Sequence, residues 1–301
     1  MRKIEKRSIF CLILAALLGL GLAFFCFQFV VDGGDWASYP YNRHLYNNAG
    51  QLKGGTILDR DGDMLSTLDE DGNRIYNDDA TVRRATLHAV GDKNGNIGAG
   101  ALTSFADKLS GYNLLTGVYS PLGTGNSLYL TIDAYLNNVA YQALNGMNGT
   151  VGIYNYKTGE ILCMVSTPTF DPANPPDIAA DDPAWDGVYV NRLLSANSIP
   201  GSIFKVVTLN AAIENIPDLF QRKWTCTGSV NIGGEEVTCP HAHGEQDIEE
   251  ALANSCNGVF GQLAVELGGE TMQKYADAAG LTKAIKVDGI QSSVGQFDFS
   301  G

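Results

Sequence analysis

The N-terminal region contains an apolar run, at residues 9–31, that carries no charged side chain. A helix needs about 20 apolar residues to cross the hydrocarbon core of a bilayer. Four basic residues precede the run and Asp32 follows it, so the positive-inside rule places the N-terminus in the cytoplasm. We therefore predict a single membrane-spanning anchor, with the bulk of the chain outside the cytoplasm.

A cleaved signal peptide is the alternative for this region. Its apolar core is shorter, about 7–15 residues, and it ends at a small-residue cleavage site. Small residues at Ala15 and Ala16, and within 19–23, leave that alternative open. The length of the run favours the uncleaved anchor.

The composition describes an acidic chain that can form a folded core. Of the 301 residues, 45% are hydrophobic and 18% are charged, and the length predicts one or two domains with appendages. The formal net charge is −13. Nucleic acid is therefore not an expected partner, because its binding proteins carry a basic surface.

Three parts follow one another along the chain. We predict a cytoplasmic tip and anchor at 1–31, a membrane-proximal linker with a small non-catalytic domain at 32–123, and a second domain at 124–301. Two Asp-x-Asp-Gly groups, at 59–62 and 69–72, predict hairpin turns in the middle part. A calcium loop would need a longer series of oxygen ligands ending in a glutamate, which neither group supplies.

The second domain begins with strands and a helix in alternation. Residues 127–133 have the pattern of a strand, and Asp133 is expected to cap a helix at 134–144. Strands at 150–156 and 160–166 are expected to pair antiparallel through a turn between them. We predict an α+β fold, in which helices pack on an antiparallel sheet.

Residues 199–215 combine a turn with an apolar helical run. Residues i and i+3 share one helix face, so Ser202 and Lys205 would lie side by side. A lysine in apolar surroundings has a lowered pKa and can take the proton of a serine, which makes the serine a nucleophile. The structural alternative is that Ser202 caps the helix and Lys205 extends to water.

Ser255-Cys256-Asn257 follows a predicted helix at 247–253. From a loop at that place, a hydroxyl and an amide can point into a cleft, although a simple helix stop is the alternative. Lys157-Thr158-Gly159 matches a named motif of serine acyl-enzymes that also carry Ser-x-x-Lys. We assign it to a hairpin turn instead, because it precedes the serine and lies between two predicted strands.

Three of the six cysteines, Cys226, Cys239 and Cys256, lie close together in the C-terminal half. Outside the cytoplasm, Cys226 and Cys239 could form a disulfide across a glycine turn. A metal site of Cys239, His241 and His243 is the alternative, but its spacing fits no common structural zinc pattern. We therefore expect no metal and no cofactor.

In their order and spacing, these segments resemble the class B penicillin-binding proteins, the membrane-anchored peptidoglycan transpeptidases. The resemblance covers nearly the whole chain, and residues 54–62 resemble the family's opening Arg-Gly-x-Ile-x-Asp-Arg-x-Gly. The other matching segments are 130–133, 157–162, 200–205 and 243–257. Each motif alone is weak evidence, whereas the ordered set is specific.

The resemblance implies a serine acyl-enzyme. Ser202 would attack the penultimate D-Ala carbonyl of a stem peptide and expel the terminal D-Ala, with Lys205 as the base. Ser255 would relay a proton to the leaving amine, and Asn257 would hold Lys205 and the substrate amide. The acyl group would pass to a second stem peptide, and β-lactams would acylate the same serine. A membrane-embedded glycosyltransferase is the expected protein partner.

The resemblance also predicts an oxyanion hole from the Ser202 N–H and a donor on a strand with Lys-Thr/Ser-Gly. The sequence ends at Gly301, before such a strand would be reached, so we expect an incomplete transpeptidase domain. Losing one oxyanion donor typically costs about 10²–10³ in rate. A non-catalytic scaffold and a penicillin-sensing receptor are therefore the alternative functions.

Overall fold

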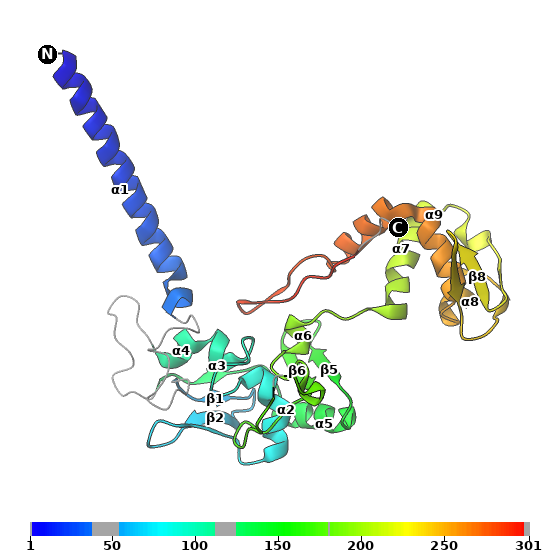
Figure 1. The fold of residues 1–301 in the computed structure, drawn as a ribbon, viewed down its shortest axis with the longest axis horizontal. Coiled ribbons are helices and arrows are strands. Elements are labelled where there is room, and N and C mark those ends of the chain that lie inside the picture. The colour runs from blue at the N-terminus through cyan, green and yellow to red at the C-terminus, as the bar shows by residue number, and fades with distance from the viewer. Residues whose placement is uncertain (1, 38–53, 112–124, 180, 298–301) are drawn as a thin grey trace. The chain divides into compact units, whose positions relative to one another are not determined.

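The computed structural model describes residues 2–37, 54–111, 125–179 and 181–297 (Figure 1). They form two compact units, Met1–Ala196 and Asn197–Gly301. This division does not coincide with the predicted boundary after residue 123, which lies outside the described residues. The mixed helix and strand content agrees with the predicted α+β fold.

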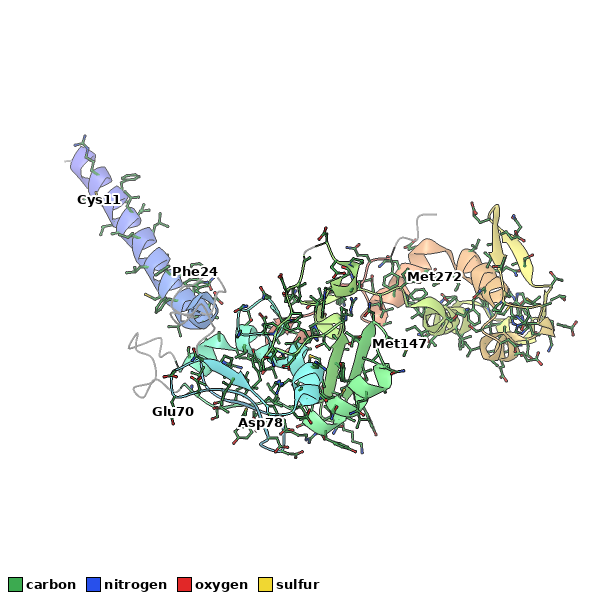
Figure 2. The ribbon with its side chains drawn as sticks, turned by 60° about the horizontal axis from the view of Figure 1, so that its bottom comes forward. Cys11, Phe24, Glu70, Asp78, Met147 and Met272 are labelled. Carbon is green, nitrogen blue, oxygen red and sulfur yellow. The ribbon has the colours of Figure 1, made fainter. Side chains whose placement is uncertain are left out.

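Helix α1, Arg2–Ala37, covers the predicted anchor. Within the described ranges, its segment Arg7–Gly33 is the one helix long and apolar enough to cross a membrane. Its side chains point outward along the helix, as Cys11 and Phe24 do in Figure 2. This exposure fits a helix whose apolar surface is meant for lipid.

A small sheet in the first unit has the strand order β3-β2-β1-β4. Its β1–β2 and β2–β3 pairs are antiparallel, and β4 joins β1 in parallel. The Asp59 carboxylate accepts bonds from the N–H groups of Asp61 and Asp63, and Asp69 does the same for Asp71 and Asn73. The predicted hairpin turns are therefore confirmed. The strands are β1 (Ile57–Leu58), β2 (Met64–Leu68), β3 (Arg74–Tyr76) and β4 (Leu128–Tyr129).

Helix α5, Ala134–Leu144, has the predicted bounds and is capped by Asp133, whose carboxylate accepts from the Leu136 N–H at 2.9 Å. It packs on the antiparallel pair β5 (Gly149–Tyr154) and β6 (Ile161–Thr167). The predicted strand at 127–133 is shorter than expected, because only β4 pairs and the chain then turns into the α5 cap. The remaining helices of this unit are α2 (Ala80–Val90), α3 (Ala101–Ser104), α4 (Ala106–Ser110), η2 (Pro183–Trp185) and α6 (Arg192–Ser195).

An ion pair links α2 to the loop that follows β6. Arg83 forms two bonds with Asp171, Nε to Oδ1 at 2.6 Å and Nη2 to Oδ2 at 2.7 Å. The Arg83 hydrogen bond lowers the pKa of Asp171 to about 2. A carboxylate with a lowered pKa stabilises the fold above its ordinary pKa of 3.8, and this contribution is lost as the pH falls from there through about 2.

The second unit is built on two packed elements, the helix α7 (Lys205–Asn215) and the helical segment α9 (Asn257–Ala278). A kink divides α9 at Gly268, whose φ of 75° is not helical. A hairpin of β8 and β9 lies along α9 (Figure 1). The approach is close, because a Cβ added at Gly261 would lie 2.7 Å from the Ile232 Cδ1 atom. The other elements are η3 (Gly201–Phe204), η4 (Leu219–Gln221), β7 (Trp224–Cys226), β8 (Ser229–Ile232), β9 (Glu235–Thr238), β10 (Gly244–Gln246), α8 (Ile248–Ala253), β11 (Lys286–Val287) and β12 (Ile290–Gln291).

Candidate active site

One lysine stands at the centre of a polar cluster in the second unit. Lys205 Nζ donates to Ser202 Oγ at 2.9 Å, to Ser255 Oγ at 3.1 Å and to Asn257 Oδ1 at 2.7 Å. The four residues singled out from the sequence therefore meet at a single amine. Ser202 and Lys205 come from one segment, and the other two come from about 50 residues further along the chain.

The local backbone explains how Ser202 and Lys205 are presented. Gly201, with a φ of 56°, begins the short 3-10 turn η3, and α7 begins at Lys205. The predicted helix therefore starts three residues later than Ser202, although the two side chains still share one face. Ser202 is exposed, whereas Lys205 is only 9% exposed. An accessible hydroxyl next to a buried amine suits a nucleophile and its base.

The turn between α8 and α9 supplies the other two residues of the cluster, Ser255 and Asn257. Asp247 and Glu250 form a capping box that fixes the start of α8. Ser255 then adopts a φ of 50°, in the left-handed region that costs energy for a residue other than glycine. Asn257 opens α9, and its Nδ2 donates to the Thr238 carbonyl at 2.8 Å. This bond ties the second half of the cluster to the end of β9.

A cleft of about 720 Å³ opens beside the cluster, between α7 and α9. Ser202, Lys205 and Asn257 lie on its wall, so all three face one space. The remaining surface is mainly apolar. It includes Phe204, Thr208, Phe260, Ala264, Val265 and Met272.

Burial lowers the pKa of Lys205 from its ordinary value of 10.5, while Cys239 and Cys256 oppose this change. Desolvation disfavours the ammonium form, so the neutral amine is more populated than on an exposed lysine. A neutral amine 2.9 Å from Ser202 Oγ can accept the hydroxyl proton. The arrangement can therefore generate a serine alkoxide.

Exchanging Asn257 for aspartate should raise the pKa of Lys205, because a carboxylate near the amine favours the ammonium form. The pKa is measured by NMR titration of ¹³C-lysine-labelled chain, with Lys205→Arg identifying the resonance. We expect the wild-type amine to titrate below 10.5 and the Asn257→Asp amine at a higher pH than the wild type. Asn231→Asp, the same exchange on the exposed β8 strand, should leave the titration unchanged. An unchanged or lower pKa in Asn257→Asp would contradict this geometry.

Three cysteines and one histidine form a second cluster directly behind Asn257. The donor atoms of Cys226, Cys239, His243 and Cys256 all lie within 4.8 Å of one another. All the cysteines in the described residues are free thiols, so the disulfide considered for Cys226 and Cys239 is not present. His241 is not part of this group and instead packs edge-to-face on His243.

The metal site considered from the sequence was Cys239, His241 and His243; it wrongly included His241 and lacked Cys226 and Cys256. The feature of the sequence that could have indicated this cluster was the density of cysteines and histidines between residues 226 and 256. Lys157-Thr158-Gly159 lies in the β5–β6 turn of the first unit, where Gly159 has a φ of 79°. Its assignment to a hairpin turn is confirmed.

Comparison with known proteins gives a consistent set of relatives. Residues 149–300 match the model of the penicillin binding protein transpeptidase domain. The stage V sporulation protein D of Bacillus subtilis is 34% identical over 182 residues, 56% of this chain and 27% of that protein. The peptidoglycan D,D-transpeptidase PbpA of Mycolicibacterium smegmatis is 30% identical over 178 residues, 52% of this chain and 36% of that protein. The chain thus spans about a third of these relatives or less.

Solved structures share the fold. The D,D-transpeptidase domain of a peptidoglycan glycosyltransferase from Eggerthella lenta has a TM-score of 0.64 at 28% identity, over 80% of this chain and 56% of that chain. The penicillin G acyl-enzyme of penicillin-binding protein A from M. tuberculosis has a TM-score of 0.61 at 22% identity, over 80% of this chain and 62% of that chain. At 22% identity, the similarity to this second structure supports a shared fold and nothing further.

Proposed function

This chain belongs to the class B penicillin-binding proteins, and we propose that its Ser202 forms acyl-enzymes as part of a peptidoglycan D,D-transpeptidase. The observation that carries the proposal is the placement of Lys205 Nζ within 2.7–3.1 Å of Ser202, Ser255 and Asn257. A serine that only caps a helix, or a lysine that extends to water, would not explain a buried amine with three hydrogen-bond partners. The substrate is a stem peptide that ends in D-Ala-D-Ala.

In the first step, neutral Lys205 takes the proton of Ser202 Oγ, and the oxygen attacks the penultimate D-Ala carbonyl. The Ser202 N–H, at the start of the η3 turn, is one donor toward the oxygen on which negative charge develops. The proton then returns from Lys205 through Ser255 Oγ, 3.1 Å away, to the departing amine. The C–N bond breaks, D-Ala leaves, and the acyl group remains as an ester on Ser202.

In the second step, the amine of another stem peptide attacks this ester and regenerates Ser202, with Lys205 again taking and returning a proton. Asn257 holds Lys205 through Oδ1 and is placed to contact the substrate amide. A β-lactam follows the first step only, because its opened ring stays attached where D-Ala would leave. β-Lactams are therefore both inhibitors and probes of this site.

Helix α1 supports a location at the cell membrane. We propose that it crosses the membrane once, with the basic residues Arg2, Lys3, Lys6 and Arg7 in the cytoplasm and the chain that follows α1 outside. This orientation would bring Ser202 to the peptidoglycan layer. A membrane-embedded glycosyltransferase that supplies new glycan strands is the expected partner, in cell elongation, division or spore formation.

A fluorescent penicillin tests the proposal on the full chain, purified in detergent. We expect a covalent label that survives denaturing electrophoresis, is lost when excess unlabelled benzylpenicillin is added first, and does not form on heat-denatured protein. A folded chain that takes no label would overturn the proposal and leave the non-catalytic scaffold as the function. Circular dichroism establishes that each sample is folded.

A further inference from the structure

We propose that Cys226, Cys239, His243 and Cys256 bind one zinc ion, which fastens the Ser255–Asn257 turn to the strands behind it. The ligand set needs no other residue, because zinc in structural sites is bound by four tetrahedral protein donors, with Cys₃His among the common sets. This inference departs from the sequence prediction of no metal. The ion site itself is independent of the proposed function.

The distances in the cluster suit a tetrahedral ion. Two sulfurs that each lie about 2.3 Å from a tetrahedral zinc are about 3.8 Å apart. Cys239 Sγ and Cys256 Sγ are 3.7 Å apart, and all four donor atoms are within 4.8 Å of one another. A disulfide would require the two sulfurs to approach to about 2.05 Å.

The topology of the second unit explains why distant residues meet here. Cys226 ends β7, and the antiparallel β7–β10 pair sets it opposite Gly244, the neighbour of His243. The β8–β9 hairpin returns the chain, so that the Cys239 N–H donates to the Gly228 carbonyl at 2.8 Å. Cys256 comes from the α8–α9 turn. Only Cys239 and His243 are close in sequence, separated by residues 240–242.

The environment favours a bound cation over four separate side chains. Cys256 is fully buried and Cys226 is 9% exposed, which suits inner positions of a site closed to solvent. His243 Nδ1 is buried and, within the described residues, has no hydrogen-bond partner. Burying a polar nitrogen without a partner costs free energy, and coordination of the imidazole would remove that cost.

Groups around the sulfurs are placed as in the outer shell of a thiolate site. The N–H groups of Gly228 and His243 face Cys226. The Gln246 side chain, 1% exposed, faces Cys256, and its Nε2 lacks any other partner in the part of the chain that the structure describes. Such donors orient metal ligands and stabilise thiolate charge.

The donor chemistry selects the metal. Thiolates and imidazole suit zinc, whereas calcium and magnesium require oxygen ligands, and none belongs to this cluster. With four protein donors there is no open position for a reacting water, so the ion is structural. Cys256 stands between Ser255 and Asn257, and Thr238, which accepts from Asn257, precedes Cys239. The ion would therefore hold the part of the turn that contacts Lys205, a role that rests on the proposed function.

The test begins with metal analysis of the full chain, purified in detergent under reducing conditions. We expect one zinc per chain, an X-ray absorption spectrum with three sulfur neighbours at about 2.3 Å and one nitrogen at about 2.0–2.1 Å, and, after exchange for Co²⁺, the visible bands of a tetrahedral thiolate site. Substoichiometric metal with four free side chains, or a Cys239–Cys256 disulfide in its place, would overturn the proposal.

Variants locate the ion. Cys226→Ser and His243→Gln should each lower the zinc content and the melting temperature, whereas the matched exchanges Cys163→Ala and His241→Gln should retain one zinc. Full zinc in the Cys226→Ser and His243→Gln proteins would contradict the assignment. Because the spectra are recorded on the wild type, an unfolded variant does not remove the test.

The role in catalysis is separable from the binding of the ion. Removing the zinc by chelation should slow penicillin acylation about 10²-fold, because misplacing a catalytic group by about 1 Å costs that much. Restoring zinc should restore the rate, and Ser202→Ala should still hold one zinc. A chain that holds zinc without reacting with penicillin would refute the proposed function but not the metal site. Unchanged acylation after zinc removal would refute the positioning role.

Discussion

Ser202→Ala is expected to abolish covalent reaction with penicillin, because the exchange removes the only atom proposed to form the ester. The fold should be preserved, since the Ser202 side chain is exposed and Lys205 keeps Ser255 and Asn257 as partners. Label intensity on denaturing gels measures the reaction, and the melting temperature measures the fold. We expect no label above background and a melting temperature close to that of the wild type.

Ser229→Ala is the matched control, because Ser229 is an exposed serine of the same unit at the start of β8. It should be labelled as fast as the wild type. Retention of label in Ser202→Ala would show that another nucleophile carries the reaction. Loss of label in the control would point to a general effect on folding.

Lys205→Arg is expected to slow acylation by about 10²–10⁴-fold, the usual contribution of a general base. Arginine keeps a positive charge near Ser255 and Asn257, but its guanidinium cannot be deprotonated in proteins. Lys205→Met, which also removes the charge, should be at least as slow. The second-order rate constant for penicillin acylation, measured by mass spectrometry over time, gives the comparison.

The pH dependence of the same rate constant separates the base from a mere positive charge. Only the neutral amine can take the Ser202 proton, so the wild-type rate should rise with pH and level off above the pKa of Lys205. Burial places that pKa below 10.5. Lys205→Arg should lose this rise over the same range. A wild-type rate that stays constant with pH would argue against Lys205 as the base.

Features that depend only on residues close together in the sequence could be predicted from the sequence. Helix α5 and its Asp133 cap, the β5–β6 hairpin and the two Asp-x-Asp-Gly turns follow from local patterns. The same is true of Ser202 and Lys205, since their spacing places them on one face of a helical segment whether its first turn is 3-10 or α.

Features that depend on the packing of segments distant in the sequence could not be predicted in this way. Nothing near Asn257 in the sequence indicates its bond to the Thr238 carbonyl, which requires β9 to end beside the start of α9. The Cys₃His cluster is of the same kind, because strand pairing and the α8–α9 turn bring its members together. Spacing alone therefore suggested Cys239, His241 and His243 as a set that fits no common zinc pattern, and only Cys239 and His243 belong to the cluster. The division into compact units after Ala196 also depends on contacts between segments that are distant in the sequence.

The most direct test of the account is the site of the penicillin adduct. The full chain is incubated with benzylpenicillin at neutral pH, digested and mapped by tandem mass spectrometry. We predict one adduct per chain, an ester on Ser202, that forms in the wild type and is absent from Ser202→Ala. A folded, zinc-containing chain with no adduct, or with its adduct on a residue other than Ser202, would contradict the assignment of Ser202 as the nucleophile.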